Sequence, residues 1–272
     1  MTLIKKSFRI RVLIVSTTLL LGSIQTASPA TYDAVSHIHH LKVVGDKIVV
    51  ATHEGLYQIV AKNKMTLIGK EKIDVMGLAS LGNTLYASGH PAMDSKMPNP
   101  IGLIKSSDGG ASWAAVSLVG KVDFHSLEGA RTELYGVDSQ SGKLMYSQDS
   151  GKDWKSLGIN SFEDIAVSPN DAGVAIAIKG KGLILTKNAF GKSSKVRTSF
   201  TPTQIEWSKS GLFALSASTL FKSTNEGKSW SKLSTFKGSA ELLSASDEMI
   251  IVTVGREIYT SQGSEILFKQ LL

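Results

Sequence analysis

The 272-residue sequence predicts an all-β fold, a single β-propeller of about six four-stranded blades. Three observations predict it. One eight-residue motif recurs at nearly constant spacing. Short runs of alternating apolar and polar residues fill the intervals between its copies, and no stretch after residue 30 keeps a helical period. The first thirty residues differ in kind and predict a signal peptide.

The recurring motif has the pattern S-x-[DN]-x-G-x-x-W. Its full copies are residues 106–113, 147–154 and 223–230, so their starts lie 41 and then 76 residues apart, the second interval being two steps of 38. A degenerate copy, residues 186–191, stands near the skipped step, and residues 261–263 lie one step after the last full copy. Repeats at this period indicate supersecondary units that pack side by side.

The residue types of the motif have separate physical roles. Asp or Asn accepts hydrogen bonds from the backbone of its own turn, and Gly tolerates the positive φ that such a turn needs. Trp adds a large apolar plate that can pack between neighbouring sheets. The motif therefore predicts a turn between the third and fourth strands of each blade that carries it.

The spacing divides residues 31–272 into blades with four short strands each. Residues 91–100 form a long insertion in the second blade. The closure of the ring stays open at this point, since residues 31–36 could add a strand to the last blade. The predicted blades are residues 37–72, 74–121, 122–160, 161–199, 200–238 and 239–272.

The motif and its register resemble the Asp-box, or bacterial-neuraminidase-repeat, propellers. The resemblance covers residues 37–272, and segments such as 37–39, 52–56, 87–91 and 123–125 look similar to small secreted bacterial propellers described as glycosyl hydrolases or sialidase-like proteins. The family also includes receptor domains and photosystem assembly factors. The box is a structural element, so the resemblance implies the propeller fold and leaves the activity open.

The N-terminal segment predicts export. Lys5, Lys6, Arg9 and Arg11 precede an apolar run over residues 12–24, and small residues then offer cleavage after Ala27 or Ala30. An uncleaved anchor is the alternative, but the run is shorter than the ~20 residues of a spanning helix. We therefore expect a signal peptide over residues 1–30, a secreted or extracytoplasmic protein, and no membrane span after cleavage.

The charge and the absence of cysteine limit the classes of binding partner. Four of the 30 basic residues and none of the 23 acidic residues lie in the first thirty positions, so the remaining chain carries only +3. This charge is no footprint for nucleic acid. Without cysteine the chain has neither disulfides nor thiolate metal sites. We expect a monomer whose partner is a small ligand, a glycan or an extracytoplasmic protein.

The histidine distribution is the strongest functional signal, because all six lie within the first 125 residues. In a propeller the innermost strand of a blade begins at the face to which the second strand returns. The histidines near these strand ends should therefore gather at one face near the axis. Imidazole binds Zn²⁺ and Cu²⁺, with a carboxylate as ligand or orienting group. The candidate metal ligands are His37, His39, His53, His90, Asp123 and His125.

A structural role is the alternative for these side chains, since histidines at strand ends also bond the backbone or line a wet channel. Met93 and Met97 stand in the insertion after His90. Thioethers beside imidazoles favour copper, whereas methionines that merely cover the channel are the more common case.

Four carboxylates are expected on the same face, at the starts of the inner strands of the last three blades. Two carboxylates across a pocket could hydrolyse glycosides, but solvated rim charges are the plainer interpretation because no pair stands out by spacing. These weak catalytic candidates are Glu163, Asp164, Glu206 and Glu241.

Sialidase activity is improbable. The family resemblance implies three arginines around the substrate carboxylate, and the chain after residue 30 has only Arg131, Arg197 and Arg256. Of these, only Arg256 is expected on the histidine-bearing face. Three classes of function therefore remain: a binding module with a metal or small ligand at its axial histidines, a glycosidase, and a non-catalytic scaffold for a protein partner.

Overall fold

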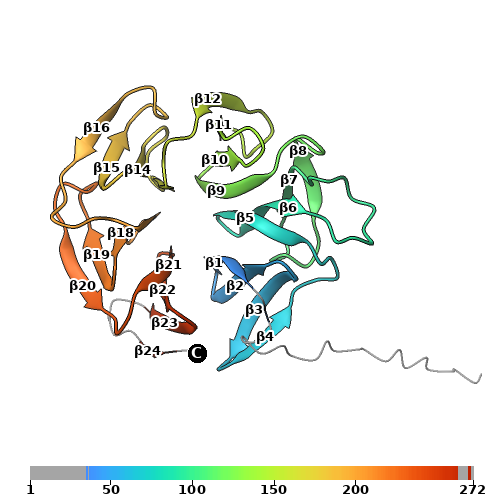
Figure 1. Cartoon of the computed structure of the whole chain (residues 1–272), viewed down its shortest axis with the longest axis horizontal. Coiled ribbons are helices and arrows are strands. Elements are labelled where there is room, and N and C mark those ends of the chain that lie inside the picture. The colour runs from blue at the N-terminus through green and yellow to red at the C-terminus, as the bar shows by residue number, and fades with distance from the viewer. Residues whose placement is uncertain (1–34, 36, 263–268, 271–272) are drawn as a thin grey trace, which may run out of the picture.

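The computed structural model describes residues 35, 37–262 and 269–270. It is a ring of six antiparallel four-stranded sheets, so the predicted all-β propeller is confirmed (Figure 1). The predicted signal peptide lies outside the described residues. Nowhere in the described part does a helix have the length and apolarity needed to span a membrane.

Each sheet is built from four consecutive strands, and each lies inside one predicted blade range. The first three blades consist of β1 (Ile38–Val44), β2 (Lys47–Thr52), β3 (Gly55–Ala61) and β4 (Lys64–Leu67); β5 (Asp74–Leu81), β6 (Thr84–His90), β7 (Leu103–Ser106) and β8 (Ala114–Ser117); and β9 (Phe124–Ala130), β10 (Glu133–Asp138), β11 (Lys143–Ser147) and β12 (Lys155–Ile159).

The last three blades follow the same order around the ring. They consist of β13 (Asp164–Val167), β14 (Ala175–Lys179), β15 (Gly182–Thr186) and β16 (Ser193–Val196); β17 (Gln204–Ser208), β18 (Gly211–Ser216), β19 (Thr219–Ser223) and β20 (Ser231–Thr235); and β21 (Ala240–Ala245), β22 (Met249–Val254), β23 (Glu257–Gln262) and β24 (Lys269–Gln270).

The ring closes by side-chain packing between the first and last blades. Every strand of the last sheet comes from the C-terminal part of the chain, and β1 lies beside β21 in Figure 1. The interface is apolar: Val43 and Val50 of the first blade share a buried cluster with Ile251 and Ile258 of the last. Burying such side chains is worth roughly 1.5–3 kcal/mol each, which holds the ring shut in place of strand exchange within the described residues.

The Asp-box turns adopt one geometry. In the first copy the Ser106 hydroxyl accepts the Gly110 N–H at 2.7 Å, and Asp108 accepts the Ser112 N–H at 2.9 Å. The degenerate fourth-blade copy keeps both contacts, with Thr186 and Asn188 in these roles. The pattern found in sequence therefore describes a real, repeated turn between the third and fourth strands.

The box tryptophans pack against the preceding blade. Trp154 of the third blade lies 4.8 Å from Phe124, centroid to centroid, in a cluster that includes Leu103 of the second blade. Trp113 and Trp230 occupy equivalent places between the first and second and between the fourth and fifth blades. All three rings are half-buried, so they cover the seams between blades from outside.

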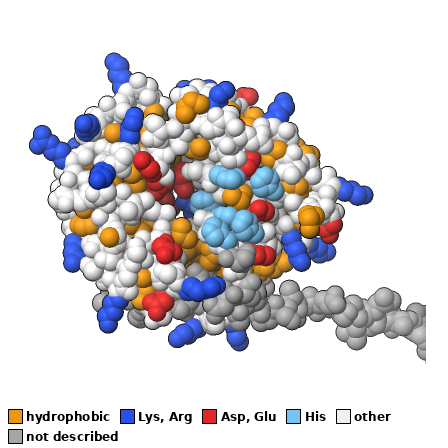
Figure 2. All heavy atoms as spheres, viewed as in Figure 1, with side chains coloured by type: hydrophobic (Ala, Val, Ile, Leu, Met, Phe, Trp, Pro, Cys, Tyr) orange, Lys and Arg blue, Asp and Glu red, His pale blue; other side chains and the backbone are white. Residues whose placement is uncertain are grey.

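The strand directions define two faces of the disc. At the histidine face the six innermost strands begin and the second strands end. At the box face the innermost strands end and the Asp-box turns lie. Figure 2 views the histidine face and shows two neighbouring groups of histidines beside the central opening, with acidic side chains at the opening.

Candidate metal centre

The first histidine group lies entirely on the first blade. Pairing of Ile38 with Thr52 across β1 and β2 sets His37 and His39 beside His53. His39 Nε2 lies 3.2 Å from His53 Nδ1, and each of the three rings offers one nitrogen within 4.8 Å of the others. Three imidazole nitrogens at this spacing can hold a metal ion after small rotamer changes. These residues are called the first triad.

Asp74 joins the first triad from the neighbouring blade. As the first residue of β5 it accepts a hydrogen bond from His53 Nδ1 at 2.9 Å, and its Oδ1 lies 3.5 Å from His39 Nε2. Sequence reasoning did not select Asp74. A signal existed, because the residue begins an innermost strand just as Asp164 does.

The imidazole of His39 is held neutral. Burial and, next, the neighbouring His53 lower the pKa of His39 to about 4, and Asp74 only partly opposes them. At neutral pH the ring therefore keeps a lone pair available for a metal ion. The side chain is 10% exposed, whereas His37 and His53 are exposed and leave the triad accessible from solvent.

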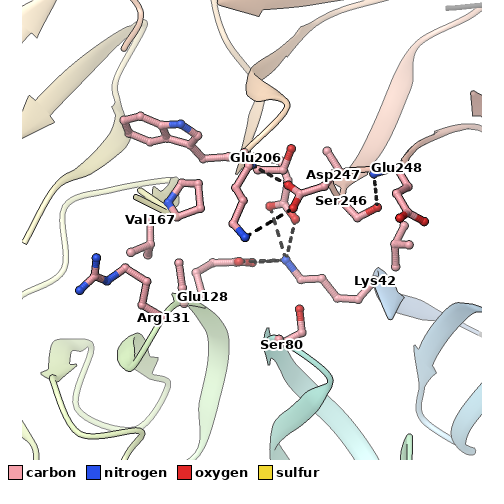
Figure 3. Close-up of a pocket in the computed structure, with 18 of the residues that line it drawn as sticks. Lys42, Ser80, Glu128, Arg131, Val167, Glu206, Ser246, Asp247 and Glu248 are labelled. Atoms are coloured by element: carbon pink, nitrogen blue, oxygen red, sulfur yellow. Dashed lines mark hydrogen bonds and ion pairs between the residues drawn. The ribbon is translucent and has the colours of Figure 1, made fainter. Parts of the chain in front are cut away.

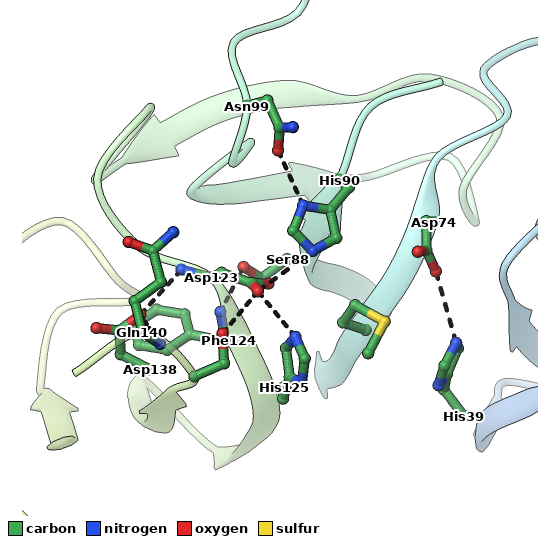
Figure 4. Close-up of polar contacts among 12 residues, drawn as sticks. His39, Asp74, Ser88, His90, Asn99, Asp123, Phe124, His125, Asp138 and Gln140 are labelled. Carbon is green, nitrogen blue, oxygen red and sulfur yellow. Dashed lines mark hydrogen bonds and ion pairs between the residues drawn. The ribbon is translucent and has the colours of Figure 1, made fainter. Parts of the chain in front are cut away.

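The second group joins two blades (Figure 4). His90 ends β6, while Asp123 and His125 flank the start of β9. The Asp123 Oδ2 atom lies 3.3 Å from His90 Nε2 and 2.8 Å from His125 Nε2. One ligand atom from each residue comes within 4.8 Å of the other two, so this second triad can also hold a metal ion.

Polar neighbours fix the orientation of the second triad. Asn99 Oδ1 lies 2.8 Å from His90 Nδ1, and an amide oxygen can only accept, so Nδ1 carries the proton. In the neutral ring the lone pair of Nε2 then faces the Asp123 carboxylate, and the two repel each other. A cation bound between them would turn this repulsion into attraction. The Ser139 hydroxyl donates to Asp123 Oδ2 at 2.7 Å.

The other oxygen of Asp123 is unusual. Asp123 is 3% exposed, and its Oδ1 is a buried atom without a hydrogen-bond partner in the described structure. Leaving a buried carboxylate oxygen unsatisfied costs roughly 1–3 kcal/mol or more. Both histidine contacts use Oδ2, so a cation would offset this cost only if the carboxylate bound it through both oxygens.

The structure thus divides the predicted histidine cluster into two triads. His40, the remaining histidine, belongs to neither: its Nε2 lies 2.9 Å from the carbonyl oxygen of Met76, and burial lowers its pKa to about 4. The two methionines also separate. Met97 packs against the core between the first two blades, whereas Met93 is fully exposed at a hollow of about 450 Å³ that His53 and Asp74 also line.

Three of the four predicted carboxylates, Glu163, Asp164 and Glu206, line one small cavity, and Glu241 does not. Glu163 and Glu241 are exposed, and Glu163 accepts the Gly180 N–H at 3.0 Å. Asp164 accepts the Ile205 N–H at 2.8 Å, and burial together with the charge of nearby Glu128 raises its pKa to about 8. Asp164 is therefore largely protonated at neutral pH.

Glu206 belongs to a buried ion cluster on the axis. Lys42 Nζ lies 2.9 Å from Glu128 and 3.1 Å from Glu206. Burial alone would lower the pKa of Lys42, but the charges of both glutamates outweigh it and raise the pKa. Lys42, Glu128 and Glu206 are called the axial ion cluster. Sequence reasoning missed Lys42 and Glu128, although each stands as a charged residue within a predicted innermost strand.

Comparisons with known proteins find similarity in the fold. No family model and no curated protein sequence matches the chain. The solved structure of YCF48 bound to D1 peptide is similar with a TM-score of 0.52 and 16% identity, covering 94% of this chain and 88% of that one. The crystal structure of a nidogen/laminin complex is similar with a TM-score of 0.60 and 10% identity, covering 83% and 92%. The chain is a six-bladed β-propeller that resembles these two in architecture.

Proposed function

We propose that this protein is an exported binding module whose histidine face holds divalent metal ions, Zn²⁺ or Cu²⁺, at the two triads. The observation that carries the proposal is the second triad, where two imidazoles converge on a buried carboxylate that has one oxygen unsatisfied. The first triad adds three imidazole nitrogens, one of them held neutral by burial. Both donor sets suit borderline divalent ions.

A binding role is favoured over glycoside hydrolysis. Three of the four carboxylate candidates share a small cavity of about 170 Å³, but there Glu206 is tied to Lys42 and Asp164 accepts the Ile205 N–H. Two solved structures of similar fold are complexes, one with a peptide and one with laminin, which supports recognition as the use of the architecture. The hollow beside His53 and Met93 offers space for a small ligand next to the first triad.

Export remains part of the proposal and rests on the N-terminal sequence pattern. An extracytoplasmic location fits a chain without cysteine that uses imidazole and carboxylate ligands, because no thiol is then open to oxidation.

Metal titration tests the proposal directly. The purified protein is stripped with a chelator, dialysed and titrated with ZnSO₄ or CuSO₄ by isothermal calorimetry. We expect two equivalents to bind, one for each triad, with dissociation constants well below about 1 mM. His39→Ala should remove one equivalent, His125→Ala the other, and the double variant both.

His40→Gln serves as the matched control, because His40 lies on the same strand outside both triads, and its stoichiometry should stay at that of the parent protein. Circular dichroism checks that every variant stays folded. If neither metal binds more tightly than about 1 mM, or if the double variant binds like the parent, the metal proposal is wrong and the protein-binding scaffold becomes the better explanation.

A further inference from the structure

A second cavity opens on the box face, away from both triads. It has a volume of about 530 Å³ and is lined by the ends of the innermost strands and the turns that follow them, with contributions from all six blades. Figure 3 shows its floor, where Lys42, Glu128 and Glu206 approach one another from the first, third and fifth blades. This cavity is called the axial funnel.

The floor of the funnel is a largely buried ion cluster. Lys42 Nζ donates to both oxygens of Glu128, at 3.2 and 2.9 Å, and to both oxygens of Glu206, at 3.1 and 3.4 Å. The side chains of Lys42, Glu128 and Glu206 are 8%, 15% and 13% exposed. One ammonium group thus serves two carboxylates that have little other solvation.

The charges of this cluster do not balance. Two carboxylates face one ammonium, and Asp164, which lines a neighbouring cavity together with both glutamates, is largely protonated at neutral pH and does not balance them. Burial raises the pKa of Glu206 above its ordinary value to about 7, because the charge of Lys42 opposes this only in part and the charge of Glu128 adds to it. A buried carboxylate without a full cationic partner is costly, so the floor of the funnel favours a second cation.

The acceptors needed to bind that cation are present. Among the described residues, Lys42 is the one hydrogen-bond donor to Glu128, and a carboxylate has about four lone-pair positions. The rim of the funnel carries both signs, since Arg131, Lys209, Asp247 and Glu248 line it and Lys209 pairs with Asp247 at 4.0 Å. The rim charges cancel, so the attraction for a cation comes from Glu128 and Glu206 at the floor.

The walls favour an organic cation over a metal ion. Val43, Val167, Pro169 and the ring of Trp207 line the funnel above the carboxylates and suit an alkyl chain. A divalent metal ion would sit close to the Lys42 ammonium, which repels it strongly in a poorly solvated site. A primary ammonium group carries a single charge and three N–H donors, which can reach both glutamates.

We propose that the axial funnel binds a primary alkylammonium ion, either as a small amine or as the lysine side chain of a peptide, with its nitrogen at Glu128 and Glu206 and its chain against Trp207. No residue of either triad lines the funnel, although His39 lines a smaller neighbouring cavity together with Lys42, Glu128 and Glu206.

The probe is n-butylammonium chloride, followed by NMR titration of the full chain in the presence of a chelator. We expect saturable binding with a dissociation constant of about 1 mM or tighter, and binding at least ~10-fold weaker for n-butanol, which has the same chain without the charge. Equal binding of the two probes would overturn the proposal. The double variant His39→Ala with His125→Ala should bind the amine as the parent does, so failure of the metal sites leaves this test intact.

Two variants at the floor should act in opposite directions. Glu206→Gln leaves Lys42 paired one to one with Glu128 and should weaken butylammonium binding at least ~10-fold. At about pH 8, where both glutamates are charged, Lys42→Met leaves two carboxylates without a cation and should strengthen butylammonium binding at least ~10-fold. Asp153→Asn, which changes an exposed carboxylate outside the funnel, is the control and should change the affinity less than ~3-fold. Unchanged binding in Glu206→Gln refutes the proposal, and this variant decides alone if Lys42→Met does not fold.

A pair of short peptides separates the two sources of the amine. Acetyl-Gly-Lys-Gly-amide and the same peptide with norleucine in place of lysine differ only in the ammonium group. Selective binding of the lysine peptide, weaker in Glu206→Gln, indicates a peptide ligand. Binding of butylammonium without the lysine peptide restricts the site to small amines, and binding of neither probe refutes the proposal.

Discussion

Replacing Lys42 by Met tests the energetics of the axial ion cluster. Methionine has nearly the length of lysine and fills its volume, so the change removes the charge without leaving a cavity. Glu128 and Glu206 then remain buried at 15% and 13% exposure without a cation. Breaking a buried ion pair by removing one partner costs ~3–5 kcal/mol, which we expect as the loss of unfolding free energy at about pH 8.

The loss should depend on pH with a defined sign. Without Lys42 the pKa values of both glutamates in the folded state rise further above the ordinary value near 4.5, because burial disfavours the charged form. A group whose pKa is raised in the folded state contributes stability that is fully present below its pKa in the unfolded state. This contribution is lost as the pH rises through its pKa in the folded state. The variant should therefore recover as the pH falls toward ~4.5, and at about pH 5 the loss should be less than ~1 kcal/mol.

Urea unfolding followed by tryptophan fluorescence at about pH 5 and pH 8 measures both values. The control replaces Glu128 and Glu206 by Gln in the Lys42→Met background, which removes the buried charges and should restore most of the stability at pH 8. An equal loss at both pH values, or a loss below ~1 kcal/mol at pH 8, would refute this account of the cluster.

Three further predictions concern the blades and export. Trp154→Ala should lower the unfolding free energy by ~3 kcal/mol, because the ring is half-buried against Phe124 and donates to the Gly151 carbonyl at 2.9 Å. A loss of unfolding free energy below ~1 kcal/mol in urea unfolding would contradict the role of Trp154 at the seam between blades. Gly151→Ala should cost ~2–4 kcal/mol in the same assay, since φ is +82° and a Cβ would lie 2.1 Å from Leu103, whereas Gly142→Ala, with open space around it, should cost only ~1 kcal/mol. The mature protein recovered outside the cytoplasm should have an intact mass that begins after Ala27 or Ala30, and a mass that includes Met1 would contradict export.

The blade order and the turns were predictable from sequence because they depend on local chemistry. The box turn is held by a Ser or Thr hydroxyl and an Asp or Asn oxygen, each of which accepts the backbone N–H four residues later. These contacts lie within one turn, so the degenerate copy at Thr186 and Asn188 could also be recognised from sequence. The face on which each strand-end histidine lies also follows from strand alternation and the antiparallel order of a blade.

The division of the histidines into two triads was decided by the tertiary structure. Strand order assigns a residue to a face, but the neighbour it meets depends on how adjacent blades pack. Asp74 reaches His53 across the seam between the first and second blades, and Asp123 reaches His90 across the next seam. Both contacts join residues whose separation in sequence carries no periodic signal.

The axial ion cluster is the clearest case of contacts that the sequence alone could not predict. Lys42 meets Glu128 and Glu206, 86 and 164 residues away in the chain, because the first, third and fifth blades point their innermost strands at one axis. The sequence alone determined the propeller, its box turns and the histidine-bearing face, since each of these depends on residues within one blade. Closure of the ring decided which charges share the axis, because only the complete circle of six blades brings those strands together.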